Sequence, residues 1–208
     1  RAEMSTKIKL CGMFRECDVD YVNEAKPDYI GFIVMFPKSH RNIGFETALR
    51  LKSRLLPGIK SIAVSVNAPV EQLAEFAIRG AADILQCHGS EDAEYIARLR
   101  RLTGVPIIKA VKVTSAADIE NAQKLGADYL LLDSGTGSGV TFDHSLIDRG
   151  KIRIPFFLAG GLTPENLGQA VRDIHPYAVD LSSGIETDKL KDREKILAAV
   201  REVRNALG

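Results

Sequence analysis

Gly126-Ala-Asp-Tyr-Leu-Leu131 is one of four similar segments that decide which fold this chain adopts. The others are Lys26-Pro-Asp-Tyr-Ile-Gly31, Gly80-Ala-Ala-Asp-Ile-Leu85 and His175-Pro-Tyr-Ala-Val-Asp180. Each ends a helix-like stretch, makes a turn and leads into a short apolar run. The four recur at intervals of roughly 45 to 55 residues, which is the length of two strand–helix units. Four such quarters predict eight strands.

Short apolar runs alternate with helix-like segments along the chain, and this alternation predicts a parallel sheet. Strands are expected at Lys7–Cys11, Tyr29–Val34, Ser61–Val66, Asp83–Gln86, Pro106–Val111, Tyr129–Asp133, Ile154–Ala159 and Ala178–Leu181. Helices are expected at Val19–Ala25, Phe45–Leu55, Val70–Arg79, Asp92–Leu102, Ala116–Leu125, Pro164–Asp173 and Leu190–Leu207, with a short one near Ser145–Asp148. Four repeated quarters favour a closed α/β fold, the (β/α)8 TIM barrel, over an open doubly wound sheet. Residues 4–208 are expected to form this single barrel domain.

The composition is that of an ordinary globular protein. The chain has 208 residues, 45% of them hydrophobic and 26% charged, and a formal net charge of +1. A balance so close to neutral gives no reason to expect nucleic acid or a membrane surface as a partner. No apolar run approaches the roughly 18 residues of a spanning helix, and the N-terminus lacks the apolar core of a signal peptide. We expect a cytoplasmic protein, with residues 1–3, before Met4, as a remnant of cloning.

The three cysteines, Cys11, Cys17 and Cys87, are odd in number and widely spaced. This pattern fits reduced thiols better than a disulfide framework. The chain contains neither a CxxC pair nor an HxxxH pair, so we expect no metal site.

Catalytic groups of such barrels lie at the C-terminal ends of the strands, and Cys11 ends the first strand. Alternation along this strand places Ile8 and Leu10 outside, against helices, and Lys9 and Cys11 inside. A lysine so close to the thiol is expected to lower the thiol pKa from its reference near 8.5, which would make Cys11 a usable base. The alternative is an inert, buried cysteine.

Asp180 is predicted to point into the barrel from the eighth strand. The first and eighth strands are neighbours in a closed barrel. We therefore hypothesise that Asp180 pairs with the buried Lys9, which needs a partner, or contacts a substrate hydroxyl.

Asp133 ends the sixth strand after four residues that include three leucines. It is either the first residue of an Asx turn or an acid held at the mouth of the barrel. Glycines at positions 135, 137 and 139 follow it, and they would allow a mobile loop to close over a substrate.

The ends of the seventh and eighth strands have the character of a phosphate site. Gly160 and Gly161 follow one strand, and Ser182, Ser183 and Gly184 follow the other. Glycines let backbone N–H groups approach an anion closely, and phosphate sites recur at these two positions in barrels. Ordinary turns are the alternative.

Two further candidates follow other strands. Arg41 lies in a basic, proline-containing loop after the second strand, where it can grip a carboxylate through two hydrogen bonds or remain a solvated charge. His88 follows the fourth strand, and we expect it to contact the substrate.

Taken together, the strand ends resemble the phosphoribosylanthranilate isomerase family, from about Lys7 to Leu207. The matching motifs, in order, are Lys9-Leu-Cys-Gly12, Pro37-Lys-Ser-His-Arg41, Val66-Asn-Ala-Pro69, Leu85-Gln-Cys-His-Gly89, Leu132-Asp133, Gly137-Ser-Gly-Val-Thr-Phe-Asp143, Ala159-Gly-Gly-Leu-Thr-Pro-Glu-Asn166 and Asp180-Leu-Ser-Ser-Gly-Ile-Glu186. The chain departs from the usual pattern at Met13-Phe14, at Cys87 and in a shorter segment after Asp133.

The resemblance implies a barrel of the ribulose-phosphate-binding type and a role for most of the candidates. The family's cysteine base falls on Cys11, its aspartate acid on Asp133, and its carboxylate-binding arginine on Arg41. Its phosphate loops fall on Gly160–Gly161 and Ser182–Gly184.

The implied reaction is the Amadori rearrangement of N-(5-phosphoribosyl)anthranilate to 1-(2-carboxyphenylamino)-1-deoxyribulose 5-phosphate, in tryptophan biosynthesis. It is expected to need no metal or cofactor and no partner beyond this small phosphoribosyl substrate, and we expect a monomer. The alternatives are another phosphosugar aldose–ketose isomerase and a non-catalytic phosphate-binding barrel, because barrels of this type host many chemistries.

Overall fold

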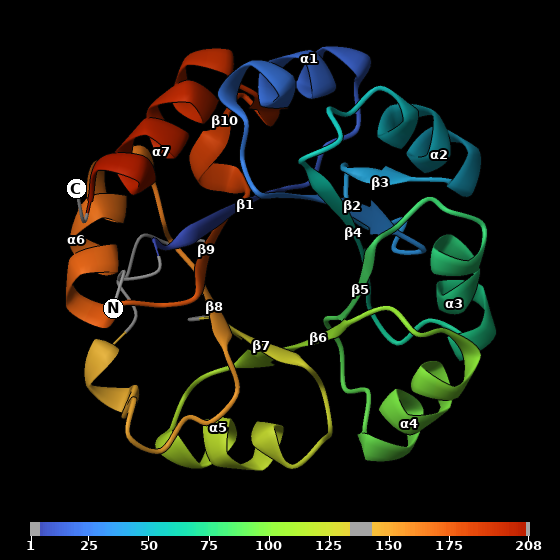
Figure 1. Ribbon diagram of the computed structural model, residues 1–208, viewed down its shortest axis with the longest axis vertical. Coiled ribbons are helices and arrows are strands. Elements are labelled where there is room, and N and C mark those ends of the chain that lie inside the picture. The colour runs from blue at the N-terminus through green and yellow to red at the C-terminus, as the bar shows by residue number, and fades with distance from the viewer. Residues whose placement is uncertain (1–4, 134–142, 207–208) are drawn as a thin grey trace.

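The strands of the computed structural model close into a barrel, and residues 5–133 and 143–206 are described (Figure 1). The eight barrel strands are β1 (Lys7–Cys11), β2 (Tyr29–Val34), β4 (Lys60–Ser65), β5 (Ile84–Cys87), β6 (Ile107–Lys112), β7 (Tyr129–Asp133), β8 (Phe156–Ala159) and β9 (Ala178–Leu181). All are parallel to their neighbours, and β9 pairs with β1. The expected (β/α)8 architecture is therefore confirmed, and the open sheet is excluded. The glycine-rich loop expected to close over a substrate lies outside the described residues.

Helices surround the barrel on its outside (Figure 1). The described residues contain α1 (Glu16–Ala25), α2 (Phe45–Ser53), α3 (Val70–Ile78), α4 (Ala93–Leu102), α5 (Ala116–Gln123), α6 (Pro164–Ile174) and α7 (Arg193–Asn205). The short helix expected near Ser145–Asp148 is instead a single 3₁₀ turn, η1 (His144–Leu146). Most other bounds differ from the expected ones by one or two residues.

Two helices begin three residues away from the predicted position, and side-chain caps explain both. The helix expected from Val19 begins at Glu16, because the Asp18 carboxylate accepts hydrogen bonds from the backbone N–H groups before it. The last helix begins at Arg193 rather than Leu190, because Asp192 caps it.

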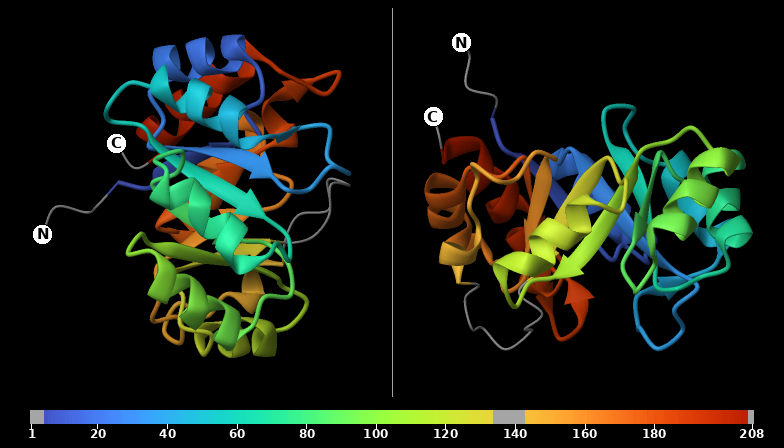
Figure 2. Two further views of the ribbon diagram at one scale, coloured as in Figure 1. Left: turned by 90° about the vertical axis from the view of Figure 1, so that its right-hand side faces the viewer. Right: turned by 90° about the horizontal axis from the view of Figure 1, so that it is seen from below.

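Three short strands were not foreseen from the sequence. β3 (Asn42–Ile43) extends the sheet beside β2. β10 (Glu186–Thr187) and β11 (Leu190–Lys191) form an antiparallel hairpin, in place of the expected first residues of the last helix. The barrel strands point towards the side of the molecule on which this hairpin and the β2–β3 loop lie (Figure 2).

The four repeated segments share one backbone conformation. Lys26, Gly80, Gly126 and His175 all have φ between +51° and +90°, in the left-handed region that ends a helix. In the first three repeats an aspartate follows, and its carboxylate accepts a hydrogen bond of 2.8 or 2.9 Å from the backbone of the neighbouring strand. Each repeat therefore ends a helix, and the first three also anchor the base of the barrel.

Two apolar layers hold the barrel together. Ile8 and Leu10 are fully buried in the outer layer, between strands and helices, whereas Cys11 belongs to the inner layer. The rings of Tyr29, Tyr177 and Phe157 pack in the inner layer, and the two tyrosine hydroxyls are 2.6 Å apart. These rings fill the interior at the N-terminal ends of the strands.

Candidate active site

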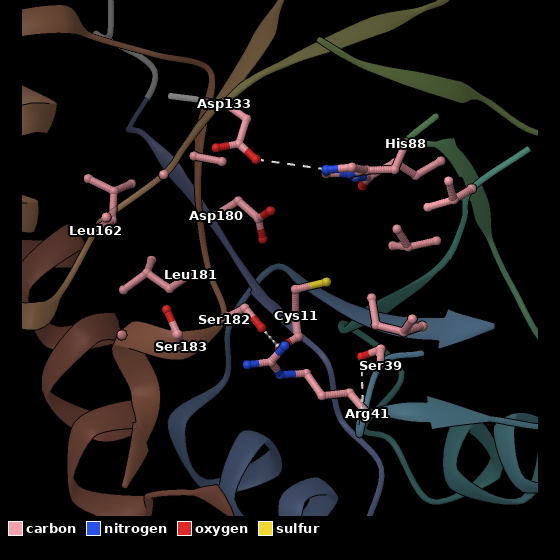
Figure 3. Close-up of a pocket in the computed structure, with 18 of the residues that line it drawn as sticks. Cys11, Ser39, Arg41, His88, Asp133, Leu162, Asp180, Leu181, Ser182 and Ser183 are labelled. Carbon is pink, nitrogen blue, oxygen red and sulfur yellow. Dashed lines mark hydrogen bonds and ion pairs between the residues drawn. The ribbon is translucent and has the colours of Figure 1, made fainter. Parts of the chain in front are cut away.

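A cavity of about 380 Å³ lies at the C-terminal ends of the strands (Figure 3). All ten residues proposed from the sequence line it, although they come from six different strand ends: Cys11, Arg41, His88, Asp133, Gly160, Gly161, Asp180, Ser182, Ser183 and Gly184. The fold therefore brings every candidate to one place.

Lys9 is completely buried beneath this cavity. Its ammonium lies 3.3 Å from the Asp180 carboxylate and donates a 2.9 Å hydrogen bond to Gln86, so the hypothesised Lys9–Asp180 pair is confirmed. Burial by itself would lower the pKa of Lys9, but Asp180 and Cys11 outweigh it, and the pKa lies above its ordinary value. Lys9 is therefore a buried cation at neutral pH.

The expected lowering of the Cys11 pKa is wrong for this structure. Burial raises the pKa of the thiol above its ordinary value of 9.0, and the nearby Asp180 carboxylate acts in the same direction. Lys9 and, more weakly, Lys191 oppose the shift without reversing it. The sequence identified the cation but not how fully the sulfur is removed from water, and desolvation is the larger effect. Cys11 is a thiol at neutral pH.

His88 and Asp133 face one another across the cavity (Figure 3). The imidazole Nε2 lies 3.8 Å from Asp133 Oδ2, and Nδ1 lies 2.9 Å from the Gln86 side-chain amide nitrogen. Gln86, which lines the cavity and is 1% exposed, was not among the sequence candidates. Its signal was a polar residue near the end of an otherwise apolar strand, two positions before His88.

The two loops of the expected phosphate site touch one another. Gly160 and Gly161 have φ of +102° and +65°, a conformation that disfavours any side chain. A Cβ atom on Gly184 would lie 1.9 Å from the backbone oxygen of Leu162. Only glycine at position 184 allows the two loops to meet in this way.

The Arg41 guanidinium is held by a carboxylate of the protein itself. Nε and Nη2 donate hydrogen bonds of 2.8 and 2.6 Å to the two oxygens of Glu186. Lys191, whose side chain is fully buried, donates to the same carboxylate at 2.8 Å. Sequence reasoning missed Glu186 and Lys191, because the β10–β11 hairpin that pairs them was not foreseen.

The three charges shift one another's pKa. Burial would raise the pKa of Glu186, but the hydrogen bonds from Arg41 and Lys191 prevail and hold it below the ordinary value of 4.5. Burial lowers the pKa of Lys191, against the opposing effect of Glu186. The carboxylate therefore counterbalances two cations beside the cavity.

Glu186→Gln is expected to lower the free energy of unfolding at pH 7 by about 3 kcal/mol, because it leaves the buried Lys191 without a counter-charge. The wild-type carboxylate, with its lowered folded-state pKa, contributes its stability above about pH 4.5 and loses it as the pH falls further. Urea denaturation at pH 7 and pH 4 measures both effects. Between these two pH values, the free energy of unfolding should change less in the variant than in the wild type.

Glu194→Gln is the matched control for that experiment. The Glu194 side chain is 79% exposed and pairs with its neighbour Arg193 alone among the described residues, so its loss should change stability by less than about 0.5 kcal/mol. Equal stability losses in the two variants would contradict the assignment of a buried ion network to Glu186.

Comparison with known proteins identifies relatives along nearly the whole chain. A family model described as N-(5'-phosphoribosyl)anthranilate (PRA) isomerase matches residues 8–202. An N-(5'-phosphoribosyl)anthranilate isomerase of Endomicrobium trichonymphae is 42% identical over 204 residues, which cover 96% of this chain and 98% of the relative.

Solved structures of related isomerases have the same fold as this chain. Phosphoribosyl anthranilate isomerase from Thermotoga maritima has a TM-score of 0.87 at 34% identity, over 96% of this chain and 98% of that one. A second structure has a TM-score of 0.84 at 32% identity, with the same coverage. It is a phosphoribosyl anthranilate isomerase in complex with reduced 1-(o-carboxyphenylamino)-1-deoxyribulose 5-phosphate.

The described ranges contain no helix that is long and apolar enough to cross a membrane. Within those ranges, no three His, Cys, Asp or Glu side chains are grouped so that they could hold a metal ion.

Proposed function

Because the chain belongs to the N-(5'-phosphoribosyl)anthranilate isomerase family, we propose that Cys11 and Asp133 are the base and the acid of its reaction. The chain is an isomerase of tryptophan biosynthesis, and its substrate is N-(5'-phosphoribosyl)anthranilate. The observation that carries the assignment is the shared cavity. The cavity is lined by the Cys11 thiol, which lies above the buried Lys9, and by the Asp133 carboxyl from another strand. The two glycine loops that touch one another also line it.

The chemistry needs a proton donor and a proton acceptor at different atoms of one pentose. Asp133 donates its proton to the furanose ring oxygen, and the ring opens as the aryl nitrogen supplies electrons to form a Schiff base. Cys11 loses its thiol proton to solvent, and the resulting thiolate removes the proton from C2. The resulting enolamine tautomerises to the 2-ketone product. The charge of Lys9 stabilises the thiolate form of the base.

The remaining residues bind the two ends of the substrate. The phosphate lies against the loops of Gly161 and Ser183, where backbone N–H groups and the start of a short helix favour an anion. The anthranilate carboxylate meets the Arg41 guanidinium at Nη1, because Glu186 already occupies Nε and Nη2. Asp180 Oδ1 is buried without a hydrogen-bond partner among the described residues, and a substrate hydroxyl would supply one.

The test is a fluorescence assay of the purified chain with N-(5'-phosphoribosyl)anthranilate. We expect the fluorescence change that accompanies its conversion, and no isomerisation of ribose 5-phosphate, which lacks the aryl nitrogen. Absence of turnover of the anthranilate compound would contradict the function. Equal turnover of both compounds would favour a general phosphosugar isomerase.

The raised pKa of Cys11 predicts how its alkylation depends on pH. Only the thiolate reacts with iodoacetamide, so the rate should rise about tenfold per pH unit below the pKa. Because that pKa lies above 9.0, the rate at Cys11 should still be rising between pH 8 and pH 9. Peptide mass spectrometry of the alkylated protein follows this residue separately from the other two cysteines. A rate that becomes constant below pH 8 would show a lowered pKa instead.

We also propose that residues 4–208 form one domain and that the chain acts as a monomer in the cytoplasm. The large exposed hydrophobic side chains of the described residues, Leu56, Ile78, Leu102 and Leu190, come from four separate segments, and single exposed side chains of this kind are ordinary. All three cysteines are unpaired, which suits a reducing compartment. Light scattering should give the mass of one chain, 22.7 kDa.

A further inference from the structure

A chain of hydrogen bonds crosses the barrel interior from Lys9 to His88, and Gln86 is its central member. Lys9 Nζ lies 2.9 Å from Gln86 Oε1, and Gln86 Nε2 lies 2.9 Å from His88 Nδ1. Lys9 and Gln86 are 0% and 1% exposed, so water does not replace the contact between them. The chain ends at the mouth of the cavity, where His88 Nε2 faces Asp133 (Figure 3).

The direction of every hydrogen bond in this chain follows from its first member. The Lys9 ammonium can only donate, so the oxygen of the Gln86 amide must face it. The amide nitrogen then faces His88, and it too can only donate. His88 Nδ1 must therefore accept, which places the ring proton on Nε2.

The other arrangements each set two donors against one another. Reversing the amide of Gln86 would turn its NH₂ group towards the Lys9 ammonium. A proton on His88 Nδ1 would meet the amide nitrogen. Each arrangement leaves donors unsatisfied, and at the buried Lys9–Gln86 contact such a mismatch costs about 1–3 kcal/mol.

We propose that Gln86 is a positioning residue that fixes His88 as the Nε2–H tautomer, with its N–H directed at Asp133. This inference rests on the proposed role of Asp133 as the acid. Once Asp133 has given its proton to the ring oxygen, a donor that faces its carboxylate favours the charged form and so promotes the transfer. His88 has no lone pair to offer at the mouth of the cavity, so it acts there as a donor and not as a base.

The same buried cation therefore serves both sides of the site. Lys9 lies beside the Cys11 thiol, and through Gln86 it also orients the group that faces the acid. Asp180 keeps this cation charged, which keeps the direction of the chain fixed.

Long-range ¹H–¹⁵N NMR of the full chain reads the histidine tautomer directly. The chain has four histidines, and the signals that vanish in His88→Gln belong to His88. At pH 7.5, without substrate, we expect His88 to show the shifts of a protonated Nε2 and an unprotonated Nδ1. A protonated Nδ1 in the wild-type protein would overturn the proposal without any variant of Gln86.

Gln86→Glu is the decisive variant, because its carboxylate accepts from Lys9 but cannot donate to His88. We expect His88 Nδ1 to become protonated and kcat to fall at least about tenfold. Unchanged imidazole shifts in this variant would overturn the proposal.

Ser65→Ala is the matched control. This buried residue lies on the neighbouring strand β4, outside the cavity, and its hydroxyl has no hydrogen-bond partner in the described structure. Ser65→Ala should leave both the His88 imidazole shifts and kcat unchanged. An altered His88 tautomer in this variant would contradict the claim that Gln86 fixes the tautomer. The spectra need no turnover, whereas the fluorescence assay of the wild-type protein tests the function separately.

Discussion

Replacement of Cys11 with alanine, or of Asp133 with asparagine, is expected to lower kcat by at least about 10²–10⁴-fold while the barrel still folds. Alanine removes the thiol that takes the C2 proton, and asparagine keeps the size of Asp133 but has no carboxyl proton to give. Both side chains line the cavity, at the ends of β1 and β7. Steady-state fluorescence kinetics measures kcat, and circular dichroism checks the fold.

Cys17→Ala is the control for the loss of a thiol. Cys17 is half-buried on α1 and does not line the cavity, so its replacement should leave kcat unchanged. Near-normal kcat in Cys11→Ala or Asp133→Asn would remove that residue from the mechanism.

Gly184→Ala is expected to raise KM by roughly 10–100-fold, the equivalent of one charge-assisted hydrogen bond to the phosphate. The added Cβ would lie 1.9 Å from the backbone oxygen of Leu162, and neither position is the end of a flexible side chain. The two loops must therefore separate, and the phosphate loses N–H groups from one of them. Inorganic phosphate, tested as a competitive inhibitor, should inhibit the variant more weakly than the wild type, by a similar factor.

Gly104→Ala provides the matched control for the added methyl group. A Cβ at that position meets nothing within 4 Å, so KM and inhibition by phosphate should both remain as in the wild type. An unchanged KM in Gly184→Ala would show that the phosphate does not lie between these loops.

The barrel and its candidate residues could be predicted from the sequence because strand geometry is periodic. Alternation placed Lys9, Cys11 and Asp180 inside the barrel, and closure then made the first and eighth strands neighbours. Those two facts predict that Lys9 and Asp180 are neighbours, and the two side chains lie 3.3 Å apart. The ends of the helices were also predictable, because each of the four repeats ends a helix-like stretch and makes a turn, and all four do so in the structure.

Features that depend on how closely groups pack could not be predicted in the same way. The sign of the Cys11 pKa shift depends on the balance of desolvation and charge, and residue order gives only the charge. Glu186 and Lys191 meet through a hairpin whose strands have two residues each, too short for a periodic signal. Gln86 is two residues before His88, but its importance follows from the orientation of an amide between two partners.

The most direct test of the account is a crystal structure of this chain with reduced 1-(o-carboxyphenylamino)-1-deoxyribulose 5-phosphate, the compound bound in the related isomerase. We expect the phosphate to lie between the loops of Gly161 and Ser183, and the pentose chain to contact both Cys11 Sγ and the Asp133 carboxyl. A pentose out of reach of either group, or a phosphate bound at another face of the barrel, would contradict the assignment.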